Sequence, residues 1–224
     1  MPSFAFAVRA LRVGLVSVIA LTLLLSASGH AEAGVRGNRN SPSEIFEAAD
    51  LAEVVTEHMQ DYWDDIFVIS DLPYETPYAI LYDGYNYGNT GCGELETYNY
   101  SWYCLNDDTV YVNVDQVQTL REQEGDLFAA VLGVGQPMSL SVLDRVGGLG
   151  FDRNGLVSRA SQEAAACLTG VWTAELWWED VIGEADILSA MEGLETIGRT
   201  LPDAYLDGFD HEDPQSCLDG LVVY

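Results

Sequence analysis

The sequence predicts one α+β domain that is rich in helices and carries one small antiparallel sheet. Strand-forming residues bounded by turn signals lie within residues 78–114, whereas apolar residues recur at helical spacing before and after that stretch. Helices that flank an uninterrupted group of strands are typical of the α+β class. Because 48% of the residues are hydrophobic, the chain can also bury the core that a single domain of this size requires.

Residues 1–33 follow the order of a secretory signal peptide. Arg9 and Arg12 precede an apolar run at residues 13–25, and the segment ends in Ala31-Glu32-Ala33. The apolar run is shorter than the ~20 residues of a membrane span, and an uncleaved amino-terminal anchor is the alternative interpretation. We therefore expect cleavage after Ala33 and a secreted, extracellular product of a bacterial cell.

The chain is strongly acidic and contains no lysine. Its nine basic and 36 acidic residues give a formal net charge of -27. Loss of Arg9, Arg12 and Glu32 with the signal peptide would leave seven basic and 35 acidic residues, a net charge of -28. Such a surface repels phosphate backbones and anionic lipid, so we expect no nucleic acid partner and, after signal cleavage, no membrane partner. Weak buffering of multivalent cations is an alternative use of the acidic surface.

The first elements after the signal are a leader and a long helix. Residues 34–43 are polar and predict a flexible leader before a domain at residues 44–224. Ser41 and Glu44 form a capping box, and apolar residues then recur at helical spacing, so a helix is predicted at residues 43–66. Five carboxylates on this helix are interpreted as a solvated face: Glu53, Glu57, Asp61, Asp64 and Asp65.

Strands and further helices follow. Aromatic and β-branched residues bounded by turn signals predict strands at residues 78–82, 98–105 and 109–114. Asn106-Asp107-Asp108 predicts a tight hairpin between the last two. Helices are predicted at residues 115–123, 125–145, 158–178 and 184–197. The glycines at 147–150 indicate a helix-ending turn rather than a phosphate loop, since no lysine follows them.

Four cysteines lie in the predicted mature chain: Cys92, Cys104, Cys167 and Cys217. In an oxidising compartment, four cysteines indicate two disulfides, and the residues alone leave three pairings open. A zinc site made of all four cysteines is the competing interpretation. It lacks the closely spaced pairs that such sites use.

Several short blocks of the sequence occur together in one known family. They are Cys92-Gly93, Tyr103-Cys104, Val110-Tyr111-Val112 and Cys167-Leu168-Thr169-Gly170-Val171-Trp172. In this order they resemble the putative neutral zinc metallopeptidases of bacteria, which read CG, YCP, VYLD, HEVGH and ELQADCxAGVW. The resemblance covers about residues 51–224. It implies a zincin-like fold, zinc as the family cofactor, and disulfides that pair Cys92 with Cys104 and Cys167 with Cys217.

The metal-binding motif of that family is missing. A motif of the H-E-x-x-H kind needs two imidazoles one helical turn apart and a carboxylate that takes a proton from zinc-bound water. If Val134-Gly135 matches the VG of HEVGH, Leu132 and Gln136 replace the histidines and Gly133 replaces the glutamate. A gapless count from Gly125 places the motif at residues 135–139 instead. Neither register restores it, because residues 127–143 contain no His, Asp, Glu or Cys.

The second metal-binding block is also altered. Counted back from Cys167, the Glu of the family falls on Gln162 and its Asp on Ala166. Glu163 is one residue away, which rotates it ~100° around a helix. The resemblance therefore implies a secreted pseudoenzyme without cofactor or catalytic residues. We expect it to act, if at all, by binding a peptide or another exported protein, or to have a structural role.

The alternative is an active zinc metallopeptidase whose metal site has moved to His58 or His211 together with carboxylates. His58 lies in the acidic helix, where a surface imidazole is predicted, and His211 lies in a polar segment predicted to be an exposed tail loop. No serine or cysteine has the surroundings of a nucleophile. Trp172, Trp177 and Trp178 could stack on sugars, but core packing is the preferred interpretation.

Overall fold

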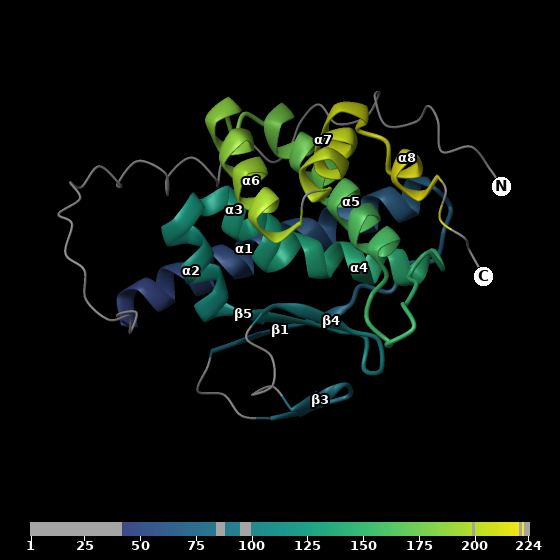
Figure 1. The fold of residues 1–224 in the computed structure, drawn as a ribbon, viewed down its shortest axis with the longest axis horizontal. Helices are drawn as coiled ribbons and strands as arrows, with labels where there is room; N and C mark the ends of the chain where they lie inside the picture. Colours follow the sequence, from purple (N-terminus) through teal and green to yellow (C-terminus); the bar gives the residue numbers. More distant parts are fainter. Residues whose placement is uncertain (1–41, 84–87, 95–99, 199, 220, 222–224) are drawn as a thin grey trace. The chain divides into compact units, whose positions relative to one another are not determined.

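The computed structural model describes residues 42–83, 88–94, 100–198, 200–219 and 221, and residues Asn40–Tyr224 form one compact unit (Figure 1). Its helix-rich α+β fold with small sheets and two disulfides confirms the predicted class. The predicted signal peptide lies outside the described residues. So does the predicted leader, except for Pro42 and Ser43, which begin the first helix.

The first helix, α1 (Pro42–Ile69), is three residues longer at its carboxyl end than predicted. Its apolar residues recur every three or four positions, and this spacing gives the helix one buried face. That face consists of Ala48, Ala52, Val55, Met59, Tyr62, Trp63, Ile66 and Phe67, all at most 8% exposed. The predicted carboxylates Glu53 and Glu57 are exposed, as expected for a solvated face.

The main sheet has the strand order β1 (Tyr78–Tyr82), β5 (Thr109–Asn113), β4 (Trp102–Cys104). β4 and β5 form the predicted antiparallel hairpin, whereas β1 lies parallel to β5. The sheet is therefore mixed, which corrects the prediction of a wholly antiparallel sheet. A parallel pair needs a long crossover, and the chain between β1 and β5, which includes β4, supplies it. Figure 1 shows this sheet on one side of the helices.

A short two-stranded ribbon lies within this crossover. It pairs β2 (Asn89–Thr90) with β3 (Gly93–Glu94) in antiparallel orientation. The disulfide Cys92–Cys104 joins the turn of the ribbon to the end of β4. The Asp107 carboxylate adds a second link, because it accepts a hydrogen bond from the backbone N–H of Gly91 at 2.6 Å.

After α2 (Val114–Glu124), the predicted helix at 125–145 forms in three parts: α3 (Asp126–Ala130), η3 (Val131–Gly135) and α4 (Gln136–Arg145). The middle part is a π-helical turn, in which the backbone N–H of Gln136 donates to the carbonyl of Val131, five residues back. A proline at position 137 removes a donor and crowds the preceding turn, and the wider turn accommodates it. The segment is long and apolar enough to cross a membrane, but 83% of its most apolar window is buried inside the protein.

Four helices complete the described residues: α5 (Arg159–Trp178), α6 (Glu184–Ile197), α7 (Leu201–His211) and α8 (Pro214–Leu218). α5 and α7 cross in direct contact through two glycines. A Cβ atom on Gly208 would lie 1.9 Å from the carbonyl oxygen of Cys167, and one on Gly170 would lie 2.0 Å from that of Tyr205. Glycine is therefore required at both positions. The disulfide Cys167–Cys217 fixes α8 to α5, and both disulfide pairings agree with those that the resemblance implied.

Candidate functional site

The positions that replace the first metal-binding motif lie in the hydrophobic core. Leu132 is 7% exposed and belongs to the main core cluster. Gly133 is buried, and a Cβ atom at this position would lie 2.6 Å from Cγ2 of Val117 on α2. Carbon atoms do not approach this closely without displacing a neighbour, and Val117 is itself fully buried. The space that a glutamate would need at position 133 is therefore filled by α2.

The carboxyl-terminal end of the motif is packed against α5. A Cβ atom on Gly135 would lie 2.6 Å from Cγ2 of Thr169, and the hydroxyls of Ser139 and Thr169 share a hydrogen bond of 2.9 Å. Gln136, in the position of the second histidine, is partly buried, and its Nε2 has no hydrogen-bond partner among the described residues. An unpaired buried amide group costs roughly 1–3 kcal/mol, so this nitrogen lowers the stability of the fold.

The second motif also lacks its donors. Ala166 is fully buried, while Gln162 is exposed and donates from Nε2 to the carbonyl oxygen of Val157 at 3.1 Å. Glu163 faces elsewhere, because its Oε1 accepts from Nε of Arg159 at 2.8 Å. This hydrogen bond lowers the pKa of Glu163 below its ordinary value, so the carboxylate stays ionised as part of a local ion pair.

The residues at the five motif positions do not fit a zinc ion: Leu132, Gly133, Gln136, Gln162 and Ala166. Zinc in proteins is held by imidazole, thiolate or carboxylate groups that point into one cavity. Leu132, Gly133 and Ala166 have no donor atom, and the amides of Gln136 and Gln162 are neutral. A glutamate between two histidines would also have no room at position 133.

His58 is not the free surface imidazole that the sequence predicted. Its side chain is 34% exposed, and both ring nitrogens face α5. Nε1–H of Trp172 donates to Nδ1 of His58 at 3.0 Å. Because an indole nitrogen only donates, Nδ1 must be the unprotonated nitrogen, and Nε2–H then faces Oε2 of Glu179 at 3.4 Å. No local sequence pattern indicates this contact, since Trp172 lies 114 positions further along the chain.

His211 is exposed as predicted, but it ends helix α7 instead of lying in a loop. Its Nδ1 lies 2.8 Å from the carbonyl oxygen of Asp207. A carbonyl oxygen only accepts, so Nδ1 carries a proton. The structure therefore places His58 and His211 in different surroundings, His58 against Trp172 and His211 in a separate cleft.

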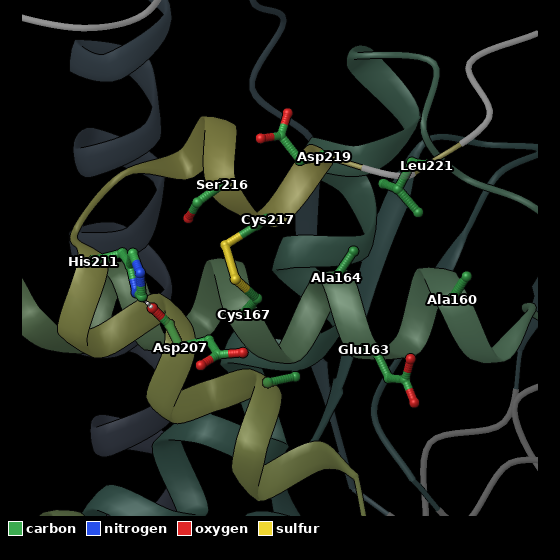
Figure 2. Close-up of a pocket in the computed structure, with 11 residues that line it drawn as sticks. Ala160, Glu163, Ala164, Cys167, Asp207, His211, Ser216, Cys217, Asp219 and Leu221 are labelled. Atoms are coloured by element: carbon green, nitrogen blue, oxygen red, sulfur yellow. Dashed lines mark hydrogen bonds between the residues drawn. A yellow bond between two sulfur atoms is a disulfide. The ribbon is translucent and has the colours of Figure 1, made fainter.

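That cleft lies between α5, α7 and α8 and has a volume of about 610 Å³ (Figure 2). Its walls are small or apolar side chains, the Cys167–Cys217 disulfide and a set of polar groups. The polar residues that line it are Glu163, Asp207, His211, Ser216 and Asp219. Ala164 faces this cleft, whereas Ala166 is two residues away and therefore points about 160° away around α5. The cleft is thus distinct from the position of the lost motif.

Among the residues that the structure describes, no group of three or more His, Cys, Asp or Glu side chains is arranged to hold a metal ion. The carboxylates of the cleft and of α1 are numerous but do not converge on one point. The geometry therefore gives no support to a relocated site around His58 or His211.

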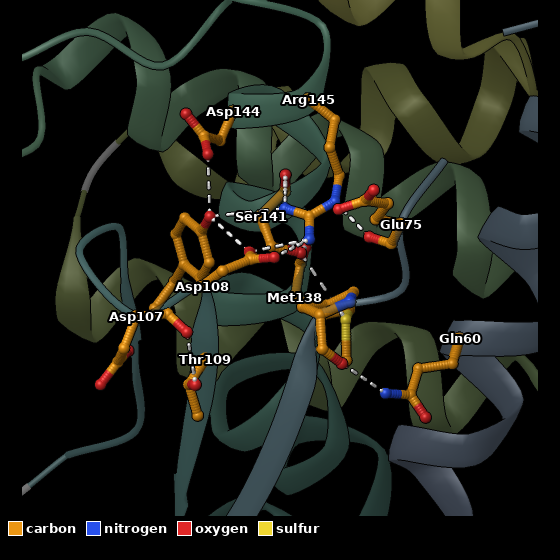
Figure 3. Close-up of polar contacts among 11 residues, drawn as sticks. Gln60, Glu75, Asp107, Asp108, Thr109, Met138, Ser141, Asp144 and Arg145 are labelled. Carbon is orange, nitrogen blue, oxygen red and sulfur yellow. Dashed lines mark hydrogen bonds and ion pairs between the residues drawn. The ribbon is translucent and has the colours of Figure 1, made fainter. Parts of the chain in front are cut away.

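A second polar cluster joins α4 to the β4–β5 turn (Figure 3). Nη2 of Arg145 donates to both carboxylate oxygens of Asp108 at 2.8 Å, and Nε donates to the carbonyl oxygen of Glu75 at 2.7 Å. The Tyr103 hydroxyl lies 2.9 Å from Asp108 and 2.8 Å from Asp144. The side chain of Arg145 is only 11% exposed, whereas that of Asp108 is 43% exposed, so the ion pair is shielded from water on the arginine side only.

Asp108 and Asp144 both lie within hydrogen-bond distance of the Tyr103 hydroxyl, and two such carboxylates could act as an acid and base pair. Here their oxygens already accept hydrogen bonds from groups within the fold. Burial raises the pKa of Tyr103, and its hydrogen bond to Asp144 raises it further, so the hydroxyl stays protonated. Arg145 forms an ion pair with Asp108, and its guanidinium carbon lies 5.7 Å from the ring centre of Tyr74. We interpret the cluster as structural, because each charged group already has a partner within the fold.

The tryptophans divide into two groups. Trp172 is 1% exposed, which agrees with the prediction of core packing. Trp178 is 64% exposed and Trp177 is 38% exposed, so the prediction was wrong for the end of α5. The helix extends beyond the core there, and the Trp177 ring makes an edge contact with Phe209.

Comparison with known proteins supports the family resemblance that the short sequence blocks indicated. The sequence model of the family described as "Putative neutral zinc metallopeptidase" matches residues 6–204. The chain belongs to this family. Proteins named "Uncharacterized protein YpfJ" from Escherichia coli strains K12 and O6:H1 (CFT073) are each 25% identical over 211 residues, which cover 79% of this chain and 72% of the relative. No solved structure matches the chain.

The sequence blocks that this chain shares with the family have structural roles in the fold. The Gly170-Val171-Trp172 block provides the glycine at the α5–α7 crossing and the indole that binds His58. The cysteine blocks provide the two disulfides. This putative neutral zinc metallopeptidase relative thus keeps residues that hold the scaffold together, and differs at the positions that would bind and use zinc.

Proposed function

We propose that the protein is an exported, catalytically inactive member of its family that acts by binding. The observation that carries the proposal is the pair Leu132 and Gly133, which fill the centre of the lost motif from inside the core. A catalytic zinc site needs an open position for water and substrate. A leucine in the core and a glycine pressed against Val117 provide neither ligands nor space.

Two features support export. The first 33 residues have the order of a signal peptide, and the described cysteines are all paired in disulfides. Disulfides of this kind form and persist mainly outside the cytoplasm. On this proposal the mature chain begins near Gly34 and meets its ligand outside the cytoplasm.

Two features support binding rather than hydrolysis. The scaffold is stabilised by two disulfides and by the direct α5–α7 contact, which keeps a rigid framework after loss of the metal. A solvent-open cleft is present on the face of α5 opposite Ala166. A peptide or another exported protein is the proposed ligand class, because the acidic surface disfavours nucleic acid and anionic lipid.

The experiment is a hydrolysis assay on fluorescently labelled casein, with the purified protein supplied with zinc and, in parallel, with a chelator. We expect no hydrolysis that the chelator abolishes. The contrary result is chelator-sensitive hydrolysis that disappears in His58→Ala or His211→Ala. That outcome would establish the alternative, a metallopeptidase with a relocated site.

A further inference from the structure

We propose that the cleft between α5, α7 and α8 binds an arginine side chain presented by a flexible segment of another polypeptide. This inference rests on the binding role proposed above and gives that role a site and a ligand class. The volume of about 610 Å³ lies within the range of about 300–1,000 Å³ that is typical of ligand sites. It can accept one long side chain together with adjoining backbone.

The polar groups of the cleft present acceptors rather than donors. The Ser216 hydroxyl donates its proton to the carbonyl oxygen of Asp213 at 2.7 Å, so its oxygen is left with free lone pairs. His211 donates from Nδ1 to the carbonyl oxygen of Asp207, so this donor is already used within the fold. The remaining polar residues that line the cleft are carboxylates. A ligand must therefore supply hydrogen-bond donors.

Two of these carboxylates are available for a cation. Glu163 is engaged by Arg159, but no ion pair within the described part of the chain involves Asp207 or Asp219. Oδ1 of Asp219 accepts one neutral hydrogen bond, from Nε2 of Gln215 at 3.4 Å. Both residues are exposed. Figure 2 shows Asp207 on one side of the Cys167–Cys217 disulfide and Asp219 on the other. The residues that line the cleft include no arginine or lysine.

The apolar walls suit the stem of a long side chain. Ala160 and Ala164 lie one turn apart on α5, and Ala204 faces them from α7. Their methyl groups leave a smooth surface beside the disulfide. Arginine covers such a surface with its methylene stem while its planar fork of donors reaches carboxylates at the rim.

A compact metal ion matches the cleft less well. The described residues contain no group of three or more ligating side chains arranged around one point. Separated carboxylates with an apolar surface between them favour an extended cation over a point charge. The overall charge of -27 adds long-range attraction for a basic segment, which accelerates encounter at low ionic strength.

The rigidity of the cleft also favours a defined ligand. α5 and α7 are held in contact by Gly170 and Gly208, and α8 is fixed by the disulfide. A preformed cleft loses less conformational entropy on binding than a loop that must become ordered.

The test is an NMR titration of the purified protein with the peptide acetyl-Gly-Arg-Gly-amide and with its neutral isostere acetyl-Gly-citrulline-Gly-amide. We expect saturable shifts of the Ala164 and Ala204 methyl signals with the arginine peptide only. The Ala48 and Ala52 methyls are internal references, because both are fully buried in α1 and do not line the cleft. Equal shifts with both peptides, or shifts that do not saturate, would overturn the proposal.

Charge variants provide the second measurement. Asp207→Asn and Asp219→Asn should each weaken binding of the arginine peptide about fivefold, the effect of one lost charge-assisted contact. Asp203→Asn is the matched control: it makes the same substitution on α7 at an exposed position that does not line the cleft. Thermal unfolding of each variant checks that the fold is retained. If all three variants weaken binding of the arginine peptide equally, the effect comes from the net charge of the protein alone. That result would refute a defined site.

Two further arms separate this proposal from the preceding one. Calcium or zinc that displaces the arginine peptide stoichiometrically would identify a metal site and overturn the arginine assignment. Absence of zinc with no peptide binding would refute the cleft proposal alone. Stoichiometric zinc together with unchanged arginine binding would instead refute catalytic inactivity and leave the cleft proposal standing.

Discussion

The clearest perturbation of the lost site is Gly133→Ala, which adds one carbon atom where the glutamate of the family would begin. The new Cβ would lie 2.6 Å from Cγ2 of Val117, well inside the van der Waals contact distance, and Val117 is fully buried. Overpacking of a core costs about 1–3 kcal/mol. Alanine regains about 0.5–1 kcal/mol of helix propensity relative to glycine, so we expect a net loss of roughly 1–2 kcal/mol in the free energy of unfolding.

Urea unfolding followed by circular dichroism measures this loss, with the midpoint read at constant slope. Val117→Ala in the same background is the matched test, because it removes the atom that alanine at position 133 would meet. In the double variant, Gly133→Ala should be neutral or slightly stabilising, a coupling of about 1–2 kcal/mol. If Gly133→Ala stabilises the wild-type background, the space at the motif is open and our explanation of the lost site is wrong.

Three further predictions concern the scaffold. Burial raises the pKa of Tyr74 and of Tyr111 from 10.0 to about 12, so their contribution to stability is complete below pH 10 and is lost as the pH rises through 12, by up to about 1.4 kcal/mol per pKa unit. Thermal unfolding between pH 8 and pH 12 checks this, and a constant melting temperature would contradict it. Arg145→Ala should cost about 2 kcal/mol in urea unfolding because it leaves Asp108 and Tyr103 without their cation, whereas Tyr103→Phe should cost only about 1 kcal/mol. Equal losses would argue against Arg145 as the centre of the cluster. Replacing Cys167 and Cys217 by alanine should cost about 4 kcal/mol and replacing Cys92 and Cys104 about 3 kcal/mol, since the cross-links close separations of 50 and 12 residues. Urea midpoints in the reverse order would show that loop entropy is not the main effect.

Local sequence patterns predicted the parts of the fold that depend on local interactions. Helices α1, α2, α5 and α6 form within three residues of their predicted bounds, because each has a long run of residues with apolar side chains at helical spacing. The turn at residues 106–108 forms the expected hairpin, and Asp108 adopts the left-handed conformation that aspartate tolerates.

Features that depend on distant residues were missed. The parallel pairing of β1 with β5 leaves no mark in either strand alone. No helix was predicted at residues 201–211, and His211 at its end was interpreted as part of a tail loop. The structure shows that Pro202 lies in the first turn, where a missing N–H is harmless, and that Gly208 serves the contact with α5.

The candidate sites likewise divide into features that residue types predict and features that depend on contacts between distant residues. Absence of zinc ligands could be read directly from the chain, because it depends on residue types alone. The contact between His58 and Trp172 could not, since it joins α1 to α5, and the cleft could not, since α7 and α8 form two of its walls. A histidine on an acidic helix gave no signal for a buried indole partner.

Zinc content tests the central claim most directly. The purified protein is dialysed against zinc and then against metal-free buffer, and zinc per chain is measured by elemental mass spectrometry. We predict a ratio near zero, because Leu132, Gly133, Gln136, Gln162 and Ala166 provide no ligand set. A ratio near one that falls in His58→Ala or His211→Ala would contradict this account and show that the metal site has moved.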